Sequence, residues 1–257
     1  MRIFVVKKST LIRAAVFLLL VIGAIVYTQV AFGSAQPAST ETTVMPVCRV
    51  GTEDKVVALT FDTAFGDADY TGQILTALKD ENAPATFFVM GLWAQEYPEE
   101  VDAMVQNGCE IASHSMSHTK YTELPETEML ADASDASELI FDMTGFDSDL
   151  IRLPYGAFNT QTIMALQGQG YIPMKWSLDS RDWKGYDASQ IADTVLSEVE
   201  SGDIIMFQNN MAATPEALPA VIAGLKEQGF TLVTVSDLLL SGEYYVDEDG
   251  TQRVYAD

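Results

Sequence analysis

The stretch VVALTFDTAFGD, residues 56–67, opens the folded part of the chain and decides its fold class. Its first half, residues 56–61, is an apolar run of strand length, and polar residues follow it. Comparable runs recur downstream, and segments with helical periodicity separate them, as is typical of βα units around a parallel sheet. The sequence predicts strands over 56–61, 85–90, 109–113, 150–153, 172–178, 203–207 and 231–235.

The helices between these strands have recognisable ends. Gly108 and Gly145 stop helices over 98–107 and 125–143, because glycine readily adopts the conformation that follows a last helical turn. Thr214 and Pro215 predict an N-cap followed by proline at the first helical position. Further helices are predicted over 70–81, 159–168 and 188–200, with a short helix after Ser236 and a terminal hairpin over 244–255.

Seven βα repeats in about 190 residues are too many for a small open sheet. We therefore predict a distorted or incomplete (β/α)7 barrel, with a doubly wound open sheet as the alternative. Both architectures place functional residues just beyond the carboxyl ends of the strands.

The N-terminal region predicts export. Arg2, Lys7, Lys8 and Arg13 precede an apolar run over 14–33, and the first forty residues contain no Asp or Glu. The length of the run suits a membrane anchor with the remainder outside the cell, whereas the small residues over 31–35 suit a cleaved signal peptide and secretion. We assign 1–33 to this anchor or signal peptide, 34–45 to a polar tether and 46–257 to one domain, with a core over 55–240 and a hairpin region over 241–257.

Charge narrows the class of partner. Beyond residue 33, ten Lys and Arg stand against 37 Asp and Glu, a net charge of −27. Such a chain is a poor partner for nucleic acid. Cys48 and Cys109 are the only cysteines, and their sequence positions leave open whether they form a disulfide.

Polar side chains cluster where four of the predicted strands end. Asp62 follows the first strand, and both histidines of the chain, His114 and His118, follow the third. Two imidazoles four positions apart are able to hold one metal ion, although the pair alone fits two surface or capping histidines equally well. The fourth and fifth strands run into Arg152, Tyr155, Asp179, Asp182 and Trp183.

Each cluster also has a structural reading when taken alone. Asp62 is placed to cap the next helix, Arg152 to form a structural ion pair, and Asp182 with Trp183 to form a turn. Four such clusters at the ends of parallel strands, together with the two histidines, favour a catalytic site.

The motifs TFD, HSxxH, RxPYG and DSxDW, in this order, resemble those of the polysaccharide deacetylase family, also called NodB-homology or carbohydrate esterase family 4. The resemblance covers about residues 55–240, and the stretches TFDTAFGD, TPEALP and VSDLL are similar to its sporulation-type branch. It implies a hydrolase that removes N-acetyl groups from amino sugars of a cell-wall polysaccharide, with peptidoglycan as the expected polysaccharide.

The resemblance also implies a role for each residue. His114 and His118 would bind a divalent metal, usually zinc with cobalt or manganese as alternatives, and Asp62 would be the general base. Arg152 would hold that base, and the main-chain N–H of Tyr155 would stabilise the oxyanion. Asp182 would tune neighbouring groups and Trp183 would wall the pocket, with Asp179 in the same motif.

Two positions depart from the family pattern. Thr63 replaces the usual third metal ligand, so that water or another oxygen such as that of Asp67 would have to substitute. Gln208 stands where the family has its general-acid histidine, and glutamine cannot supply a proton. A catalytically inactive, glycan-binding relative is therefore the alternative function, and a xylan or chitin esterase is a third reading.

Overall fold

The computed structural model describes Leu18, Val21 and residues 43–255. The chain divides into two units, Met1–Thr42 and Thr43–Asp257, and the second is described below. The predicted anchor over 1–33 and most of the tether over 34–45 lie outside the described residues. Within the described residues, no helix combines the length and apolar character that a membrane crossing needs.

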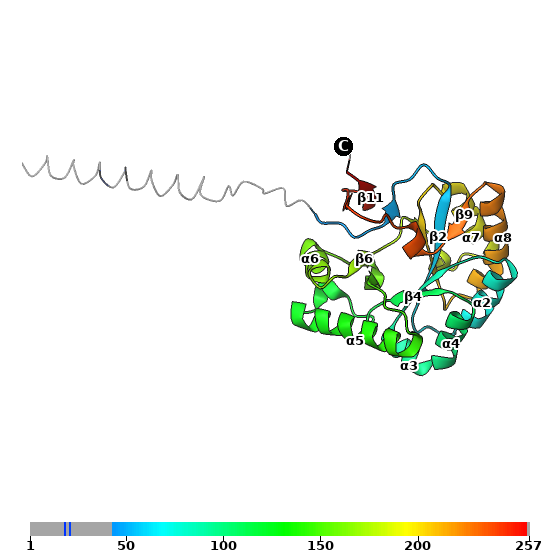
Figure 1. Cartoon of the computed structure of the whole chain (residues 1–257), viewed down its shortest axis with the longest axis horizontal. Coiled ribbons are helices and arrows are strands. Elements are labelled where there is room, and N and C mark those ends of the chain that lie inside the picture. Colours follow the sequence, from blue (N-terminus) through cyan, green and yellow to red (C-terminus); the bar gives the residue numbers. More distant parts are fainter. Residues whose placement is uncertain (1–17, 19–20, 22–42, 256–257) are drawn as a thin grey trace, which may run out of the picture. The chain divides into compact units, whose positions relative to one another are not determined.

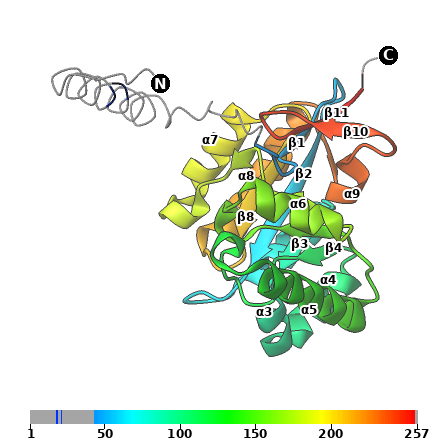
Figure 2. The same cartoon turned by 90° about the vertical axis from the view of Figure 1, so that its left-hand side faces the viewer.

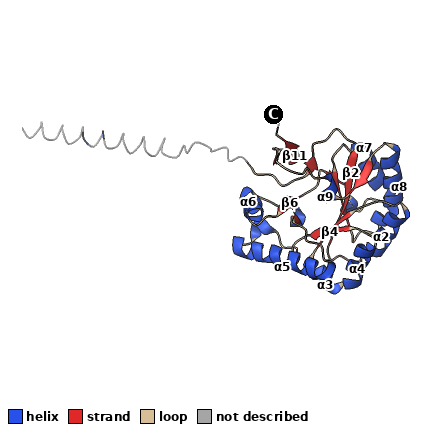
Figure 3. Cartoon of the chain, in the orientation of Figure 1, coloured by secondary structure: helices blue, strands red, loops and turns tan. Residues whose placement is uncertain are grey.

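The predicted incomplete barrel is confirmed. Seven parallel strands run in the order β6-β5-β4-β3-β2-β8-β7, so β6 and β7 are the two free edges, and the short β9 (Thr231–Val233) pairs with the start of β2. Helices surround the strands on the outside (Figures 1 and 3). The strands are β2 (Val56–Thr63), β3 (Thr86–Val89), β4 (Glu110–Ser113), β5 (Leu150–Arg152), β6 (Ile172–Met174), β7 (Leu178–Asp179) and β8 (Ile204–Gln208).

The single strand predicted over 172–178 is wrong, because it divides into β6 and β7. At the break, the N–H of Lys175 donates to the carbonyl of Val47, whereas the N–H of Ser177 donates to the carbonyl of Ile204. The chain therefore crosses from one edge of the barrel to the other over residues 175–177. Val47 lies beside Met174 in a parallel bridge and extends the β6 edge.

The helices follow the prediction with three exceptions. The helix α3 was missed, because its six residues are too short for a periodic pattern. Thr214 is no N-cap: α8 begins one residue earlier, and the Thr214 hydroxyl donates to Asp182 instead. The last helix begins at Val235 rather than after Ser236. The helices are α2 (Thr71–Asp80), α3 (Gly91–Glu96), α4 (Pro98–Gln106), α5 (Glu126–Thr144), α6 (Thr160–Gly168), α7 (Ala188–Glu198), α8 (Ala213–Glu227) and α9 (Val235–Leu238).

Alternation along β2 separates two cores. Val57, Leu59 and Phe61 pack outward among the helices, whereas Ala58 joins the cluster inside the barrel. The same alternation turns Thr60 and Asp62 toward the interior. The barrel is thus apolar near its base and polar near the carboxyl ends of its strands.

The predicted terminal hairpin is confirmed. β10 (Tyr244–Val246) pairs antiparallel with β11 (Thr251–Val254), which pairs in parallel with β1 (Arg49–Val50) at one end of the barrel (Figure 2).

Cys48 and Cys109 are both buried free thiols, so they form no disulfide with each other.

Candidate active site

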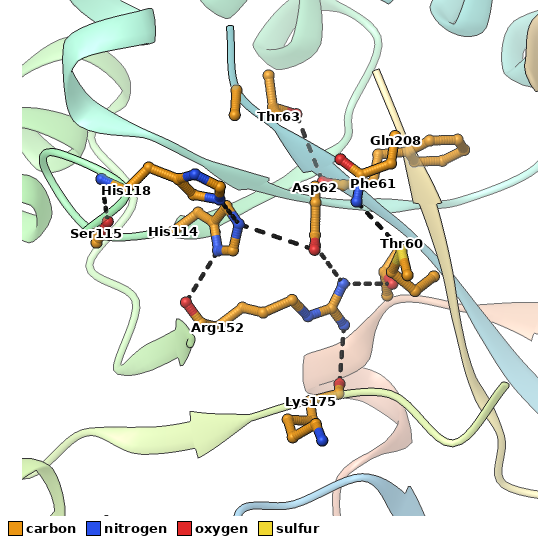
Figure 4. A network of polar contacts seen from close by, with 12 residues as sticks. Thr60, Phe61, Asp62, Thr63, His114, Ser115, His118, Arg152, Lys175 and Gln208 are labelled. Carbon is orange, nitrogen blue, oxygen red and sulfur yellow. Dashed lines mark hydrogen bonds and ion pairs between the residues drawn. The ribbon is translucent and has the colours of Figure 1, made fainter. Parts of the chain in front are cut away.

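Asp62 and Arg152 form a buried ion pair inside the barrel, at the ends of β2 and β5 (Figure 4). Arg152 Nη1 donates to Asp62 Oδ1 and to the hydroxyl of Thr60, both at 2.8 Å, and Nη2 donates to the carbonyl of Lys175 at 3.1 Å. The Phe88 ring supports the guanidinium group from 3.9 Å. One carboxylate oxygen of Asp62 is therefore fixed, and the other is turned toward the histidines.

His114 and His118 converge on one point. The main-chain carbonyl of Arg152 lies 2.9 Å from His114 Nδ1 and accepts a hydrogen bond from it. The Nε2 atom of His114 is then left to face Asp62 Oδ2 at 3.8 Å, too far for a hydrogen bond. His118 Nε2 lies 3.1 Å from the same His114 Nε2 (Figure 4).

The histidine loop is held by a residue that sequence reasoning missed. Asp132, on α5, accepts hydrogen bonds from the main-chain N–H groups of Met116 and Ser117 and from the hydroxyls of Ser117 and Tyr121. The Ser115 hydroxyl accepts from the N–H of His118 at 2.8 Å. An aspartate in mid-helix gives no sequence signal of this role.

The site is a region of backbone strain. In the part of the chain that the structure describes, five non-glycine residues have positive φ, and Ser115, His118, Tyr155 and Arg181 are four of them. All four follow β4, β5 or β7. Such conformations cost about 1–3 kcal/mol each and cluster at functional sites because the surroundings enforce them.

The two imidazoles suit a metal ion. Burial lowers the pKa of His114 despite the opposing effect of Asp62, and burial and His114 together lower the pKa of His118 to about 4. Both rings are therefore neutral at pH 7, as ligands must be. Two ligands of one tetrahedral zinc ion lie roughly 3.3 Å apart, close to the observed 3.1 Å.

A third protein ligand is missing among the described residues. They contain no group of three His, Cys, Asp or Glu side chains arranged to hold a metal ion. The buried hydroxyl of Thr63 donates to the carbonyl of Phe61 at 3.4 Å. Asp67, one of the substitutes considered for the third ligand, is exposed and does not line the cavity.

Asp182 stands behind the cavity rather than in it. Its buried carboxylate accepts from the Thr214 hydroxyl at 2.6 Å, the N–H of Trp183 at 2.7 Å and the N–H of Gln208 at 2.8 Å. Burial raises its pKa to about 6, although these hydrogen bonds oppose the shift. Asp182 thus fixes the backbone of Gln208, while the Gln208 side chain makes one long contact, to Met206 Sδ at 3.5 Å.

A cavity of about 320 Å³ connects these groups. Trp183 is half exposed at its wall and donates from Nε1 to Asp179 at 3.2 Å, and the Tyr155 ring lies 4.5 Å from that of His118. Sequence reasoning missed four lining residues, Trp176, Met206, Asn210 and Met211, because none of them belongs to a recognised motif. The lining residues are Asp62, His114, His118, Tyr155, Trp176, Asp179, Trp183, Met206, Gln208, Asn210 and Met211.

The sequence of this chain is similar to those of known polysaccharide deacetylases. The profile of the family described as polysaccharide deacetylase matches residues 49–173. The chain is 36% identical to the peptidoglycan-N-acetylmuramic acid deacetylase PdaC of Bacillus subtilis, over 74% of this chain and 40% of the relative. It therefore spans about two fifths of that relative's length. It is 32% identical to a peptidoglycan-N-acetylglucosamine deacetylase of Bacillus cereus, over 74% of this chain and 91% of the relative.

Two solved structures with a similar fold are those of one pseudoenzyme, in its wild-type and a mutant form. A CE4 family pseudoenzyme from Bacillus anthracis superposes with a TM-score of 0.71 at 26% identity, covering 81% of this chain and 70% of that one. A mutant of the same pseudoenzyme, described as having restored enzymatic activity, also superposes with a TM-score of 0.71, at 27% identity.

Proposed function

This chain belongs to the polysaccharide deacetylase family, and we propose that it hydrolyses the N-acetyl groups of amino sugars in a cell-wall polysaccharide, namely peptidoglycan. The observation that carries the proposal is the arrangement of one fixed carboxylate, Asp62, opposite two neutral imidazoles whose Nε2 atoms lie 3.1 Å apart in one cavity. Relatives named as peptidoglycan deacetylases support the choice of substrate.

We propose zinc as the ion that His114 and His118 hold. When bound, a divalent metal lowers the pKa of a water molecule and polarises a carbonyl group. With two protein ligands instead of three, we expect weaker metal affinity than an intact ligand set would give.

Asp62 acts as the general base in this proposal. Its Oδ2 takes a proton from the attacking water, while Arg152 holds Oδ1 and keeps the carboxylate oriented. The water oxygen bonds to the acetyl carbon, and the carbonyl oxygen becomes negatively charged. We propose that the main-chain N–H of Tyr155 donates to that oxygen.

Breaking the C–N bond requires a proton on the leaving nitrogen. Gln208 has no proton to give, so Asp62 returns the one it took. The products are acetic acid, which passes its proton to the amine of the sugar to give acetate and an ammonium group, and Asp62 is again a carboxylate. A separate acid typically contributes 10²–10⁴ in rate, so we expect this chain to be slow.

We also propose an extracellular location and a sporulation role. The basic and apolar N-terminal region supports a membrane anchor with the catalytic domain outside. The stretch TFDTAFGD, which is similar to the sporulation-type branch of the family, supports the role in sporulation.

The second candidate function is glycan binding without catalysis. Gln208 and Thr63 favour it, and the similarity to a pseudoenzyme shows that the family contains inactive members. A cavity walled by Trp183 and Tyr155 would serve binding equally well.

Acetate release separates the two functions. The full chain is incubated with N-acetylglucosamine oligomers or peptidoglycan and with added zinc, cobalt or manganese. The deacetylase proposal predicts acetate that is abolished by His114→Ala. A wild-type chain as silent as His114→Ala, with Gln208→His active, would instead support the binding function.

A further inference from the structure

Lysines are placed on the aromatic wall of the cavity. Lys120 Nζ lies 5.6 Å from the Tyr155 ring centroid, Lys175 Nζ 5.5 Å from that of Trp176, and Lys184 Nζ 5.0 Å from that of Trp183. All three rings line the cavity. Lys175 Nζ also lies 5.2 Å from the Phe158 ring centroid. A lysine over a ring gains about 0.5–1 kcal/mol at an exposed site, which favours each ammonium group beside its ring.

The three lysines lie together in the fold. Tyr155 follows β5, Trp176 lies in the crossing between β6 and β7, and Trp183 follows β7. β5 and β6 are paired, and only residues 175–177 join β6 to β7. The three rings, each with a lysine beside it, therefore follow strands near the edges of the barrel.

These charges stand out in so acidic a chain. Six of the ten Lys and Arg side chains among the described residues pair with carboxylates, and Lys55, Lys79, Lys175 and Lys184 do not. In the part of the chain that the structure describes, Lys175 and Lys184 form no ion pair, and Lys120 pairs only with the exposed Glu123 at 3.3 Å.

The carboxylates of the cavity are already engaged. Arg152 holds Asp62, and Asp179 accepts from the N–H of Arg181 at 2.8 Å and from Trp183 Nε1. An ammonium group retains hydrogen-bond donors even when it lies over a ring. An incoming carboxylate would therefore find free donors at the rim.

We propose that Lys120, Lys175 and Lys184 form a cationic rim that recognises carboxylates borne by the glycan. The preferred substrate would then be an N-acetylated glycan with acidic substituents rather than a neutral one. This inference rests on the proposed function for the identity of the ligand as a glycan, but its test does not depend on turnover.

Direct binding by calorimetry tests the rim. The full chain is titrated with an oligosaccharide of alternating N-acetylglucosamine and N-acetylmuramic acid, and with the same oligosaccharide after its carboxylates are converted to methyl amides. Each exposed charge pair is worth about a two- to fivefold change in affinity, and salt weakens it. We expect the acidic form to bind more tightly at low salt.

Variants assign that preference to the rim. The triple variant Lys120→Gln, Lys175→Gln, Lys184→Gln should bind both forms equally. The matched control is Lys79→Gln, which replaces an exposed lysine in the last turn of α2 and should keep the preference. A second ligand with peptide stems attached shows whether the sugar carboxylate suffices or the stem carboxylate is needed.

Three outcomes would overturn the inference: equal affinity for both forms in the wild type, a preference that the triple variant retains, or no binding of either form. Acetate release is measured in parallel on the neutral N-acetylglucosamine oligomers. Binding preference without acetate release would sink the proposed function alone, and acetate release without preference would sink the rim alone.

Discussion

The two sides of the cavity differ in how completely their polar groups are partnered. On the side of β4 and β5, Arg152 contacts Asp62, Thr60 and Lys175 with its side chain and His114 with its carbonyl. On the side of β8, the Gln208 side chain has one long contact to a thioether. The difference teaches that the groups to which the proposed mechanism assigns water activation are held by several contacts of the fold, whereas the side chain at position 208, where that mechanism needs an acid, is held by almost none.

Replacing Arg152 by methionine should have the largest effect. The variant leaves the Asp62 carboxylate buried and unpaired, which costs about 3–5 kcal/mol of unfolding free energy. Urea unfolding of the full chain measures this loss. Arg181→Met, which breaks a partly exposed pair with Glu198, should cost less than about 1 kcal/mol. Equal losses would contradict the comparison.

Gln208→His should restore a general acid on the poorly partnered side. If the protein is a slow deacetylase, acetate release should rise by roughly 10²–10⁴, and the unfolding free energy should hardly change. Gln169→His, at an exposed position after α6, is the control and should leave the rate unchanged. An unchanged rate in Gln208→His would show that the missing acid is not what limits turnover.

Asp182→Asn sharpens the comparison, because it disturbs the group that anchors the backbone of Gln208. The Thr214 hydroxyl and the N–H of Gln208 both donate to Oδ2, whereas the N–H of Trp183 donates to Oδ1. The single amide oxygen of asparagine cannot replace both carboxylate oxygens, so at least one buried donor is left unmade at a cost of about 1–3 kcal/mol. Thermal unfolding measures the loss, and Asp135→Asn on the exposed face of α5 is the control. A melting temperature equal to that of the control would contradict the role assigned to Asp182.

A further prediction concerns acid pH. The pKa of His118 is about 4 in the folded chain against 6.5 for the free side chain, so the unfolded state binds the extra proton between these values. The contribution of His118 to stability is therefore present above about pH 6.5 and is lost as the pH falls toward 4. Metal-free thermal unfolding should show this decline, and His118→Asn should weaken it. An identical decline in both proteins would refute the assignment.

The fold was largely predictable from the sequence because its signals are local. The apolar run over residues 56–61 and the helix stops at Gly108 and Gly145 depend on neighbours along the chain. The break at Lys175 was not predictable, since it depends on a hydrogen bond to Val47, which is distant in sequence.

The site was predictable as a set of residues but not as a geometry. The motifs brought Asp62, Arg152 and both histidines together correctly, because strand ends meet at one edge of a parallel barrel. Asp132 was missed because its partners are main-chain groups of a loop across from α5. The outward position of Thr63 and the lysine rim depend on packing that no motif encodes.

The hydrogen bond from the N–H of Gln208 to Asp182 has an evolutionary consequence. Because a main-chain group provides the anchor, residue 208 can be exchanged with little effect on folding. The codons of glutamine and histidine differ only in their last base. A lineage can therefore exchange glutamine and histidine at position 208 in either direction by a single base change, without disturbing the main-chain hydrogen bond to Asp182.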